Sequence, residues 1–233
     1  MPIDPESDEE HFETLVRMKN PEGGIWTPDK FLPVAERNSL MPKIDQWVTD
    51  RSLEWLTEMD MAPETNFCMN INLSAASLSD HNFLEYLSQK VSTTTNINHF
   101  VCFEMTESAA MSNYEQTVQF LNDLKRHGCS IALDDFGTGF SSLSHIRKLP
   151  LDYIKIDGVF IQEIATNELD QVLVKSVADI AKVLNIRTVA EFVDTDDALE
   201  MLGRLQIDYA QGYLFSKPEP IEMPGQESIA QAA

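Results

Sequence analysis

Residues 130–139 read Ser130-Ile131-Ala132-Leu133-Asp134-Asp135-Phe136-Gly137-Thr138-Gly139. A short apolar run, typical of a strand buried on both faces, ends here in two adjacent aspartates and a glycine-rich turn. Burying a charged group without a partner is costly, so Asp134 and Asp135 need partners from elsewhere in the chain. Glycine permits backbone angles that other residues avoid, so the turn can bend sharply beside the carboxylates and act as a mobile active-site loop.

The same pattern, a short apolar run that carries or ends in a polar side chain, recurs along the chain. Strand-like runs cover residues 67–73, 98–105, 130–133, 153–156 and 187–190. The polar residues within or just after such runs are Asn72, Glu104, Asp134, Asp135, Lys155, Glu191 and Gln211. Positions 72, 104, 134, 155, 191 and 211 are separated by 32, 30, 21, 36 and 20 residues, so each step has room for one strand and one helix.

Helical patterns lie between several of these runs, and we expect helices over residues 31–37, 44–56, 114–127 and 169–184, the third of which is stopped by Gly128. Repeated strand-helix units predict a parallel sheet, which can be open or closed. The polar residues fall near the carboxyl ends of strands, where barrel active sites lie. We therefore predict an α/β fold, and we favour a barrel because it would gather the polar residues into one site.

The composition limits the possible functions. At 43% hydrophobic residues the chain can form a core, and its formal charge of −21, from 38 acidic and 17 basic residues, disfavours binding to a long nucleic acid. A small anionic ligand is compatible with this charge, because bound cations can invert the local field. Three cysteines without metal-ligand spacing, no signal peptide and no apolar run near membrane-span length predict a cytoplasmic domain without membrane contact.

Most of these polar side chains offer an oxygen atom as a metal ligand, and Glu13 adds a further carboxylate. Such groups suit Mg²⁺ or Mn²⁺ rather than zinc or copper. Two such ions roughly 4 Å apart clamp both oxygens of an in-line phosphoryl displacement, so the set predicts phosphoester hydrolysis with Lys155 as a fixed positive charge. Each residue alone has a plainer explanation: a lone acid can cap a helix, and Lys155 can pair with Asp152 or Asp157. The recurrence at successive strand ends favours the metal site.

Several motifs together resemble one known family. They are Glu13-Thr14-Leu15, Glu104-Met105-Thr106-Glu107, Asp134-Asp135-Phe136-Gly137-Thr138-Gly139, Lys155-Ile156-Asp157, Ala190-Glu191 and Gln211-Gly212-Tyr213. In combination they are similar to the EAL-type cyclic di-GMP phosphodiesterases over residues 1–218, with 219–233 left as a loose tail. The resemblance implies a modified TIM-like (βα)8 barrel that hydrolyses cyclic di-GMP to linear pGpG by two-metal in-line attack.

The resemblance also implies a role for each site residue. The ligands of two Mg²⁺ or Mn²⁺ ions would be Glu13, Asn72, Glu104, Asp134, Asp135 and Glu191. The catalytic residues would be Lys155, Glu191, Asp135 and Gln211, and the substrate-binding residues would be Arg17, Leu15, Asp157 and Asp194. Glu107 would anchor the loop Phe136-Gly137-Thr138-Gly139, which in this family couples the site to dimerisation. A homodimer joined to upstream sensory or cyclase-like domains is therefore expected.

Some positions depart from the family pattern. Thr14 replaces the namesake alanine, Phe192 stands where glycine is usual, and Asp194 is one methylene shorter than the glutamate that would contact guanine. Family members carry a strand ending in Gln-Pro-Ile before the namesake tripeptide, and Met1-Pro2-Ile3 resembles its stump, so we expect a truncated N-terminal strand. The alternative to an enzyme is a catalytically weak or silent cyclic di-GMP receptor. The chain retains Glu13, the glutamate of the EAL tripeptide, and the pair Asp134-Asp135, which favours the enzyme.

Overall fold

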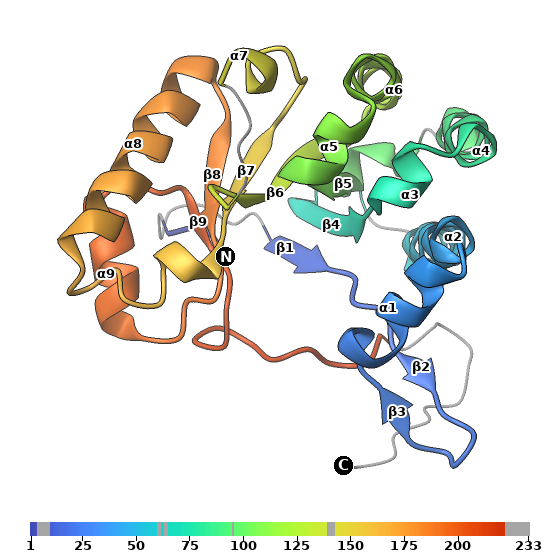
Figure 1. Ribbon diagram of the computed structural model, residues 1–233, viewed down its shortest axis with the longest axis horizontal. Helices are drawn as coiled ribbons and strands as arrows, with labels where there is room; N and C mark the ends of the chain where they lie inside the picture. Colours follow the sequence, from blue (N-terminus) through green and yellow to red (C-terminus); the bar gives the residue numbers. More distant parts are fainter. Residues whose placement is uncertain (4–9, 60–61, 63–64, 95, 139–142, 222–233) are drawn as a thin grey trace.

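The structure is a computed structural model, and it describes residues 1–3, 10–59, 62, 65–94, 96–138 and 143–221. Its main element is a seven-stranded sheet that curls on itself, with helices packed against its outer face (Figure 1). The strands, in spatial order, are β1 (Glu10–Glu13), β4 (Phe67–Asn72), β5 (Val101–Thr106), β6 (Ser130–Phe136), β7 (Tyr153–Ile156), β8 (Arg187–Ala190) and β9 (Tyr209–Ala210). Each pair of neighbours is parallel. The predicted α/β class with a barrel-like parallel sheet is confirmed.

Helices connect the strands of this sheet. They are α1 (Pro28–Arg37), α2 (Met41–Met59), α3 (Ala75–Leu78), α4 (His81–Thr93), α5 (Glu107–Ser112), α6 (Tyr114–Arg126), α7 (Leu143–Ile146), α8 (Glu168–Leu184) and α9 (Asp196–Arg204), with 3-10 turns η1 (Asn98–Phe100) and η2 (Gly158–Phe160). The four predicted helices correspond to α1, α2, α6 and α8. Three of them are slightly longer than expected, and α6 ends one residue before the predicted His127. For example, α1 begins early because Thr27 stands at its N-cap and Pro28 fits the first helical position.

The interior of the curled sheet is built in two layers. The lower one, here called the floor layer, consists of Cys68, Cys102, Ala132, Tyr153, Val189 and Tyr209, which form a buried cluster of their own. Side chains alternate along a strand, so the residue two positions further on points the same way. The residues at that spacing, here called the polar layer, are Asn70, Glu104, Asp134, Lys155, Glu191 and Gln211, to which Glu13 of β1 is added. Alternation alone therefore places a polar layer toward the carboxyl ends of the strands.

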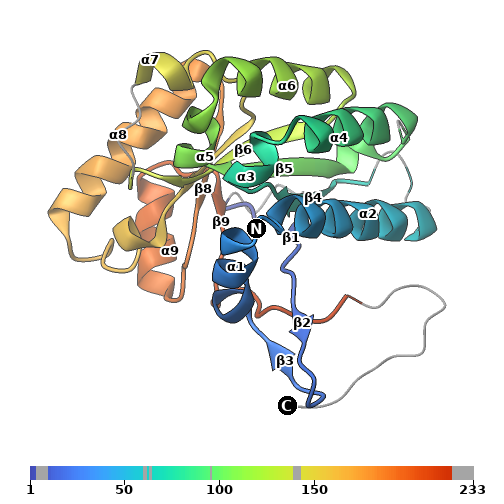
Figure 2. The ribbon, with the colours of Figure 1, turned by 45° about the vertical axis from the view of Figure 1, so that its right-hand side comes forward.

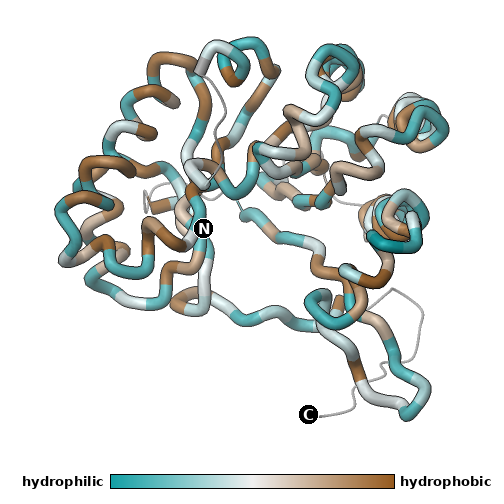
Figure 3. The backbone as a smooth tube through the Cα atoms, in the orientation of Figure 1, coloured by the Kyte–Doolittle hydropathy of each residue, from teal (hydrophilic) through white to brown (hydrophobic). Residues whose placement is uncertain are grey.

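The main apolar core lies outside the sheet, between its outer face and the helices. Strand residues that point outward, such as Ile71, Phe103 and Leu133, are fully buried there and pack with residues of α2 to α6. A second cluster joins β8 with α8 and α9 and includes Val174, Ala190 and Leu202. Figure 3 shows apolar residues recurring along the central strands and along the helices that cover them. This outer core holds the strands in place, so the polar layer inside the sheet does not have to supply apolar packing.

The edge strands of the sheet are β1 and β9. Pro2 forms an isolated antiparallel bridge with Tyr209, and the backbone N–H of Ala210 donates to the carbonyl of Met1 at 2.8 Å. The predicted stump of an N-terminal strand corresponds to this bridge, while residues 4–9 lie outside the described part of the chain. Near the carboxyl ends, Nε2 of Gln211 donates to Oε2 of Glu13 at 2.7 Å and connects the two edges.

A short antiparallel hairpin, β2 (Met18–Lys19) with β3 (Ile25–Trp26), extends away from the sheet beside α1 (Figure 2). Sequence reasoning did not predict this hairpin. Among the residues that the structure describes, none of the helices is long and apolar enough to cross a membrane. Most of the expected C-terminal tail, residues 222–233, lies outside the described residues.

Candidate active site

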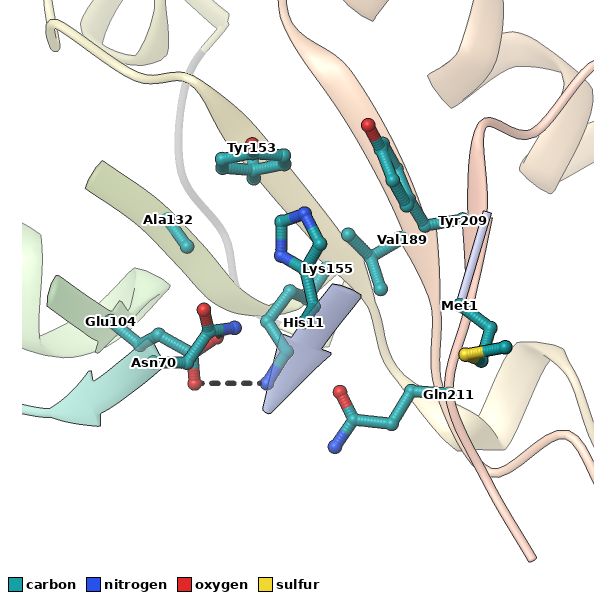
Figure 4. A pocket seen from close by; sticks show the side chains of 10 residues that line it. All are labelled: Met1, His11, Asn70, Glu104, Ala132, Tyr153, Lys155, Val189, Tyr209 and Gln211. Atoms are coloured by element: carbon teal, nitrogen blue, oxygen red, sulfur yellow. Dashed lines mark hydrogen bonds and ion pairs between the residues drawn. The ribbon is translucent and has the colours of Figure 1, made fainter. Parts of the chain in front are cut away.

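Lys155 lies at the centre of the polar layer. Its side chain is only 1% exposed, and its ammonium group is surrounded by carboxylates from four different strands or strand ends. The distances from Nζ are 2.8 Å to Glu191, 3.1 Å to Glu104, 3.3 Å to Asp134 and 3.6 Å to Glu13. Figure 4 shows the Lys155 and Glu104 side chains meeting inside the sheet. The sequence offered Asp152 and Asp157 as alternative partners of Lys155, and Lys155 pairs with neither. Asp152 binds Lys125 instead, at 2.7 Å.

Amide side chains fix the orientation of two of these carboxylates. Asn72 donates to Oε1 of Glu13 at 2.8 Å, and Gln211 donates to Oε2 of the same residue at 2.7 Å. Asn70 donates to Oε1 of Glu104, the oxygen that Lys155 does not bind. These bonds leave the carboxylates facing Lys155 and one another, as preorganised ligands must.

The pKa values show how strongly the carboxylates influence one another. Burial, opposed by Lys155 and reinforced by Glu13 and Asp134, raises the pKa of Glu104 to about 8. Burial likewise raises the pKa of Glu191 to about 7. For Glu13, burial is outweighed by Lys155 and by the two amide donors, so its pKa is lowered. One ammonium does not compensate four acids, and the remaining negative charge favours a bound cation.

The donor set fits a hard divalent cation. Asp134, Asp135 and Glu191 each present a carboxylate oxygen, and the three oxygens lie within 4.8 Å of one another. Oδ1 of Asp134 is buried and accepts no hydrogen bond from the described residues, although the Lys155 ammonium lies 3.3 Å away. Such a carboxylate oxygen is a ready ligand for Mg²⁺ or Mn²⁺.

Asp135 reaches this cluster through an unusual backbone. Its φ is +54°, in the left-handed region that few non-glycine residues adopt, and the pairing register of β6 with β7 shifts at this point. The shift lets two consecutive aspartates approach the same site, which strict alternation would forbid. Burial, Asp134 and Asp157 raise the pKa of the Asp135 carboxyl. Asp157 also caps η2, accepting from the N–H of Val159 at 2.7 Å.

The remaining predicted substrate-binding residues lie on exposed segments. Leu15 and Arg17 follow β1, and the Arg17 guanidinium donates to the neighbouring carbonyl of Val16 at 3.0 Å. Asp194 is exposed in the segment between β8 and α9. The structure thus brings the predicted metal and catalytic residues together, and it leaves Leu15, Arg17 and Asp194 on the surrounding loops.

The predicted coupling loop begins directly at the site. Gly137 adopts a φ of +101°, and its N–H donates to Oε2 of the buried Glu107 at 3.4 Å. Thr138 folds back so that its hydroxyl donates to the carbonyl of Asp135 at 2.9 Å. Phe136, the last residue of β6, is half-buried, and Gly139 lies outside the described residues. The first part of the loop is therefore held by Glu107 on one side and by the Asp135 backbone on the other.

Sequence reasoning missed Asn70 and the aromatic residues of the floor. A cavity of about 30 Å³, large enough for one or two water molecules, separates the two layers and is lined by His11, Asn70, Tyr153, Lys155, Tyr209 and others (Figure 4). Below it, the Arg187 guanidinium lies 4.5 Å from the centre of the Tyr153 ring and donates to the Tyr209 hydroxyl at 2.7 Å. Counting two residues back from each of the predicted polar positions after Asn72 would have identified every floor residue except Cys68; from Asn72 the same step leads to Asn70.

The sequence profile of the EAL domain family matches residues 2–218, and the chain belongs to this family. The cyclic di-GMP phosphodiesterase PdeB of Shewanella oneidensis is 39% identical over 215 residues, which cover 92% of this chain and 25% of that protein. The cyclic di-GMP phosphodiesterase PdeF of Escherichia coli is 38% identical over 212 residues, covering 91% of this chain and 28% of that protein. The chain thus spans about a quarter of the length of these relatives.

Solved structures show the same arrangement. The PaMucR phosphodiesterase in complex with c-di-GMP superposes with a TM-score of 0.82 at 32% identity, covering 89% of this chain and 84% of that one. The FimX EAL domain of Pseudomonas aeruginosa bound to c-di-GMP gives a TM-score of 0.83 at 27% identity, covering 94% and 87%. The curled sheet and its helices are therefore the EAL fold.

Proposed function

We propose that this chain is a metal-dependent phosphodiesterase that hydrolyses cyclic di-GMP to linear pGpG. The observation that carries the proposal is the cage of four carboxylates around Lys155, with Asp135 beside it. A receptor needs a cavity that fits the ligand, but it does not need an excess of converging acids. Relatives from two organisms, 39% and 38% identical to this chain over the parts that align, are named cyclic di-GMP phosphodiesterases.

The residues that would hold two Mg²⁺ or Mn²⁺ ions are Glu13, Asn72, Glu104, Asp134, Asp135 and Glu191. Bound divalent ions supply Lewis acidity toward phosphoryl oxygens and lower the pKa of a coordinated water. The geometric support is strongest for Asp134, Asp135 and Glu191, whose oxygens already lie close together. Glu13 and Glu104 face the same ammonium from the other side.

The protein's own groups then bind, orient and move protons. The surrounding acids outweigh burial and hold the pKa of Lys155 well above its usual value, so its ammonium stays charged and can donate to a phosphate oxygen. Glu191, which lies 2.8 Å from the Lys155 ammonium, would position water beside the phosphate. Gln211 keeps Glu13 in place and is available to position water. Arg17 would contact a substrate phosphate, while Leu15, Asp157 and Asp194 would border the nucleotide.

The proposal extends to the assembly. A row of exposed apolar side chains runs along α8 and consists of Leu169, Val172, Leu173 and Val183. A second copy of the chain would bury such a row, which supports a homodimer. Glu107 and the loop that it holds would connect that assembly to the site. We also propose that the domain acts in the cytoplasm and belongs to a longer protein with sensory or cyclase-like domains. The greater length is supported by the relatives, which are between three and four times as long as this chain.

Binding without hydrolysis is the second candidate. It is favoured by one observation, that the Lys155 ammonium itself neutralises part of the carboxylate charge. Turnover in Mg²⁺ or Mn²⁺ with an EDTA control separates the two functions. We expect chromatography to show pGpG only with the metal; binding of cyclic di-GMP without product in any metal would establish the receptor instead.

A matched pair of variants on β1 tests the site itself. Glu13→Gln removes a carboxylate 3.6 Å from Lys155, whereas Glu10→Gln changes an exposed acid of the same strand. We expect Glu13→Gln to abolish turnover and Glu10→Gln to retain it. Equal activity in both variants would contradict the ligand set.

A further inference from the structure

Phe192, the residue after Glu191, combines two unfavourable features. Its φ is +56°, in the left-handed region where a phenylalanine is a genuine outlier. Its side chain is also 62% exposed, although it is large and apolar. The chain itself gains little from this arrangement, because most of the ring faces solvent. Strained conformations of this kind cluster at ligand-binding sites, where a bound molecule supplies the missing contact.

The ring is held firmly on one side. A methyl group on Gly158 would lie 2.4 Å from Cδ2 of Phe192, so the first ring atoms lie directly on the bare backbone of Gly158. Gly158 follows Asp157, which interacts with Asp135 of the carboxylate cluster. The ring therefore lies on the rim formed by the segments after β7 and β8.

The backbone that carries Phe192 is fixed as well. The N–H of Val193 donates to the carbonyl of Gln211 at 3.0 Å, and the N–H of Leu214 donates to the carbonyl of Val193 at 3.1 Å. A side chain on Gly212 would lie 2.2 Å from that carbonyl oxygen, so the two segments are in close backbone contact. An exposed ring on a fixed backbone is preorganised for a flat apolar partner.

We propose that Phe192 is a substrate-binding residue whose exposed face stacks on one of the two bases of the substrate. The inference rests on the proposed function, which supplies a dinucleotide with two flat bases at this site. Base–aromatic stacking is tolerant of the base and strengthens binding without touching the reacting phosphate. Phe192 thus contributes to affinity, and the carboxylate cluster retains the chemistry.

The test compares Phe192→Gly, Phe192→Leu and Phe192→Tyr with the parent chain. Binding of cyclic di-GMP is measured by calorimetry in EDTA, and KM and kcat are measured in Mg²⁺. Removal of the ring in the Gly and Leu variants should raise Kd and KM about 5- to 150-fold and leave kcat within about threefold. The Tyr variant keeps a ring and should bind like the parent chain.

Two further measurements separate stacking from a structural role. Phe192→Gly should raise the melting temperature, because glycine relieves the left-handed strain; a lower melting temperature with unchanged KM would identify the ring as a structural anchor and overturn the proposal. Val159→Ala removes another exposed apolar side chain from the same rim, 59% exposed, and should leave KM unchanged. An equal rise in KM in this control, or a Leu variant that binds like Tyr, would also overturn it.

The failure of the proposed function would look different. A parent chain that neither binds nor hydrolyses cyclic di-GMP rejects both proposals. A parent chain that hydrolyses it, with Phe192→Gly giving the same Kd and KM, rejects only the stacking role.

Discussion

Val189 of β8 and Glu191, the residue that directly follows this strand, are two positions apart and point into the same interior, yet one belongs to the floor layer and the other to the polar layer. Val189 packs among floor residues such as Cys102 and Tyr209, whereas Glu191 lies 2.8 Å from a buried ammonium. The same contrast holds for Tyr153 and Lys155 on β7. One step of two residues therefore separates side chains that stabilise the sheet from side chains that make it reactive. Substitutions in the floor layer should lower the stability and spare the reaction, whereas substitutions in the polar layer should stop the reaction whether or not they lower the stability.

The largest expected effect is the loss of turnover in Asp134→Asn. The amide keeps the shape of the side chain but removes a charged oxygen that no described hydrogen bond satisfies. We expect the rate of cyclic di-GMP hydrolysis to fall at least about a hundredfold. Even the loss of a residue that only hydrogen-bonds to a metal ligand lowers metal affinity or activity about 10- to 100-fold. The melting temperature in EDTA should not fall, because one like charge has been removed from the cluster. Product formation and thermal unfolding measured together give the comparison, and a variant that loses stability but keeps its rate would assign Asp134 to the floor instead.

Lys155→Met should produce the largest loss of stability. Without the ammonium, Glu104 and three other carboxylates face one another in a buried space, and breaking a buried charge pair from one side costs about 3–5 kcal/mol. Urea unfolding in EDTA measures the loss, and added Mg²⁺ should recover part of it by taking over the positive charge. A matched Tyr153→Phe variant on the same strand should lose the hydrogen bond with Arg187 and leave the charges of the cluster unchanged. Equal stability of the Met and Phe variants would contradict the central role of Lys155.

In the floor layer, Val189→Ala should reduce stability without affecting the reaction. The valine is buried, and removing two methyl groups from a packed position costs about 1–2 kcal/mol. We expect kcat within about threefold of the parent chain. A large loss of rate with normal unfolding would show that the floor takes part in positioning Lys155 and Glu104.

The smallest effect concerns pH. In the metal-free chain the pKa of Glu104 is about 8 and that of Glu191 about 7, so the folded state binds protons that the unfolded chain releases near 4.5. The stabilisation from these protons is fully present below about pH 4.5 and is lost as the pH rises through 7 to 8. The melting temperature in EDTA should therefore fall over this range, and the fall should be smaller in Mg²⁺. A flat profile in EDTA would indicate that the two carboxyls are not buried together.

Much of the fold was predictable because alternation and spacing are local properties. The runs over residues 153–156 and 187–190 became β7 and β8 with the same limits, and the resemblance supplied Glu13, which lies far from the other motifs. Asn70 was missed because Asn70 and Asn72 face the same side, and the sequence does not show which one reaches Glu104. The backbone of Asp135 was also unpredictable, since the register shift depends on how β6 pairs with β7. Roles for Arg17 and Asp194 depend on a ligand and remain predictions.

The contact between Glu13 and Gln211 has a consequence for how the protein is made. It joins residues 198 positions apart, and the backbone link from Met1 to Ala210 is longer still. During synthesis the Glu13 carboxylate leaves the ribosome 198 residues ahead of Gln211, so it must wait for most of the domain before this partner appears. A nascent chain stopped before Gln211 should therefore bind a divalent cation more weakly than one stopped after it.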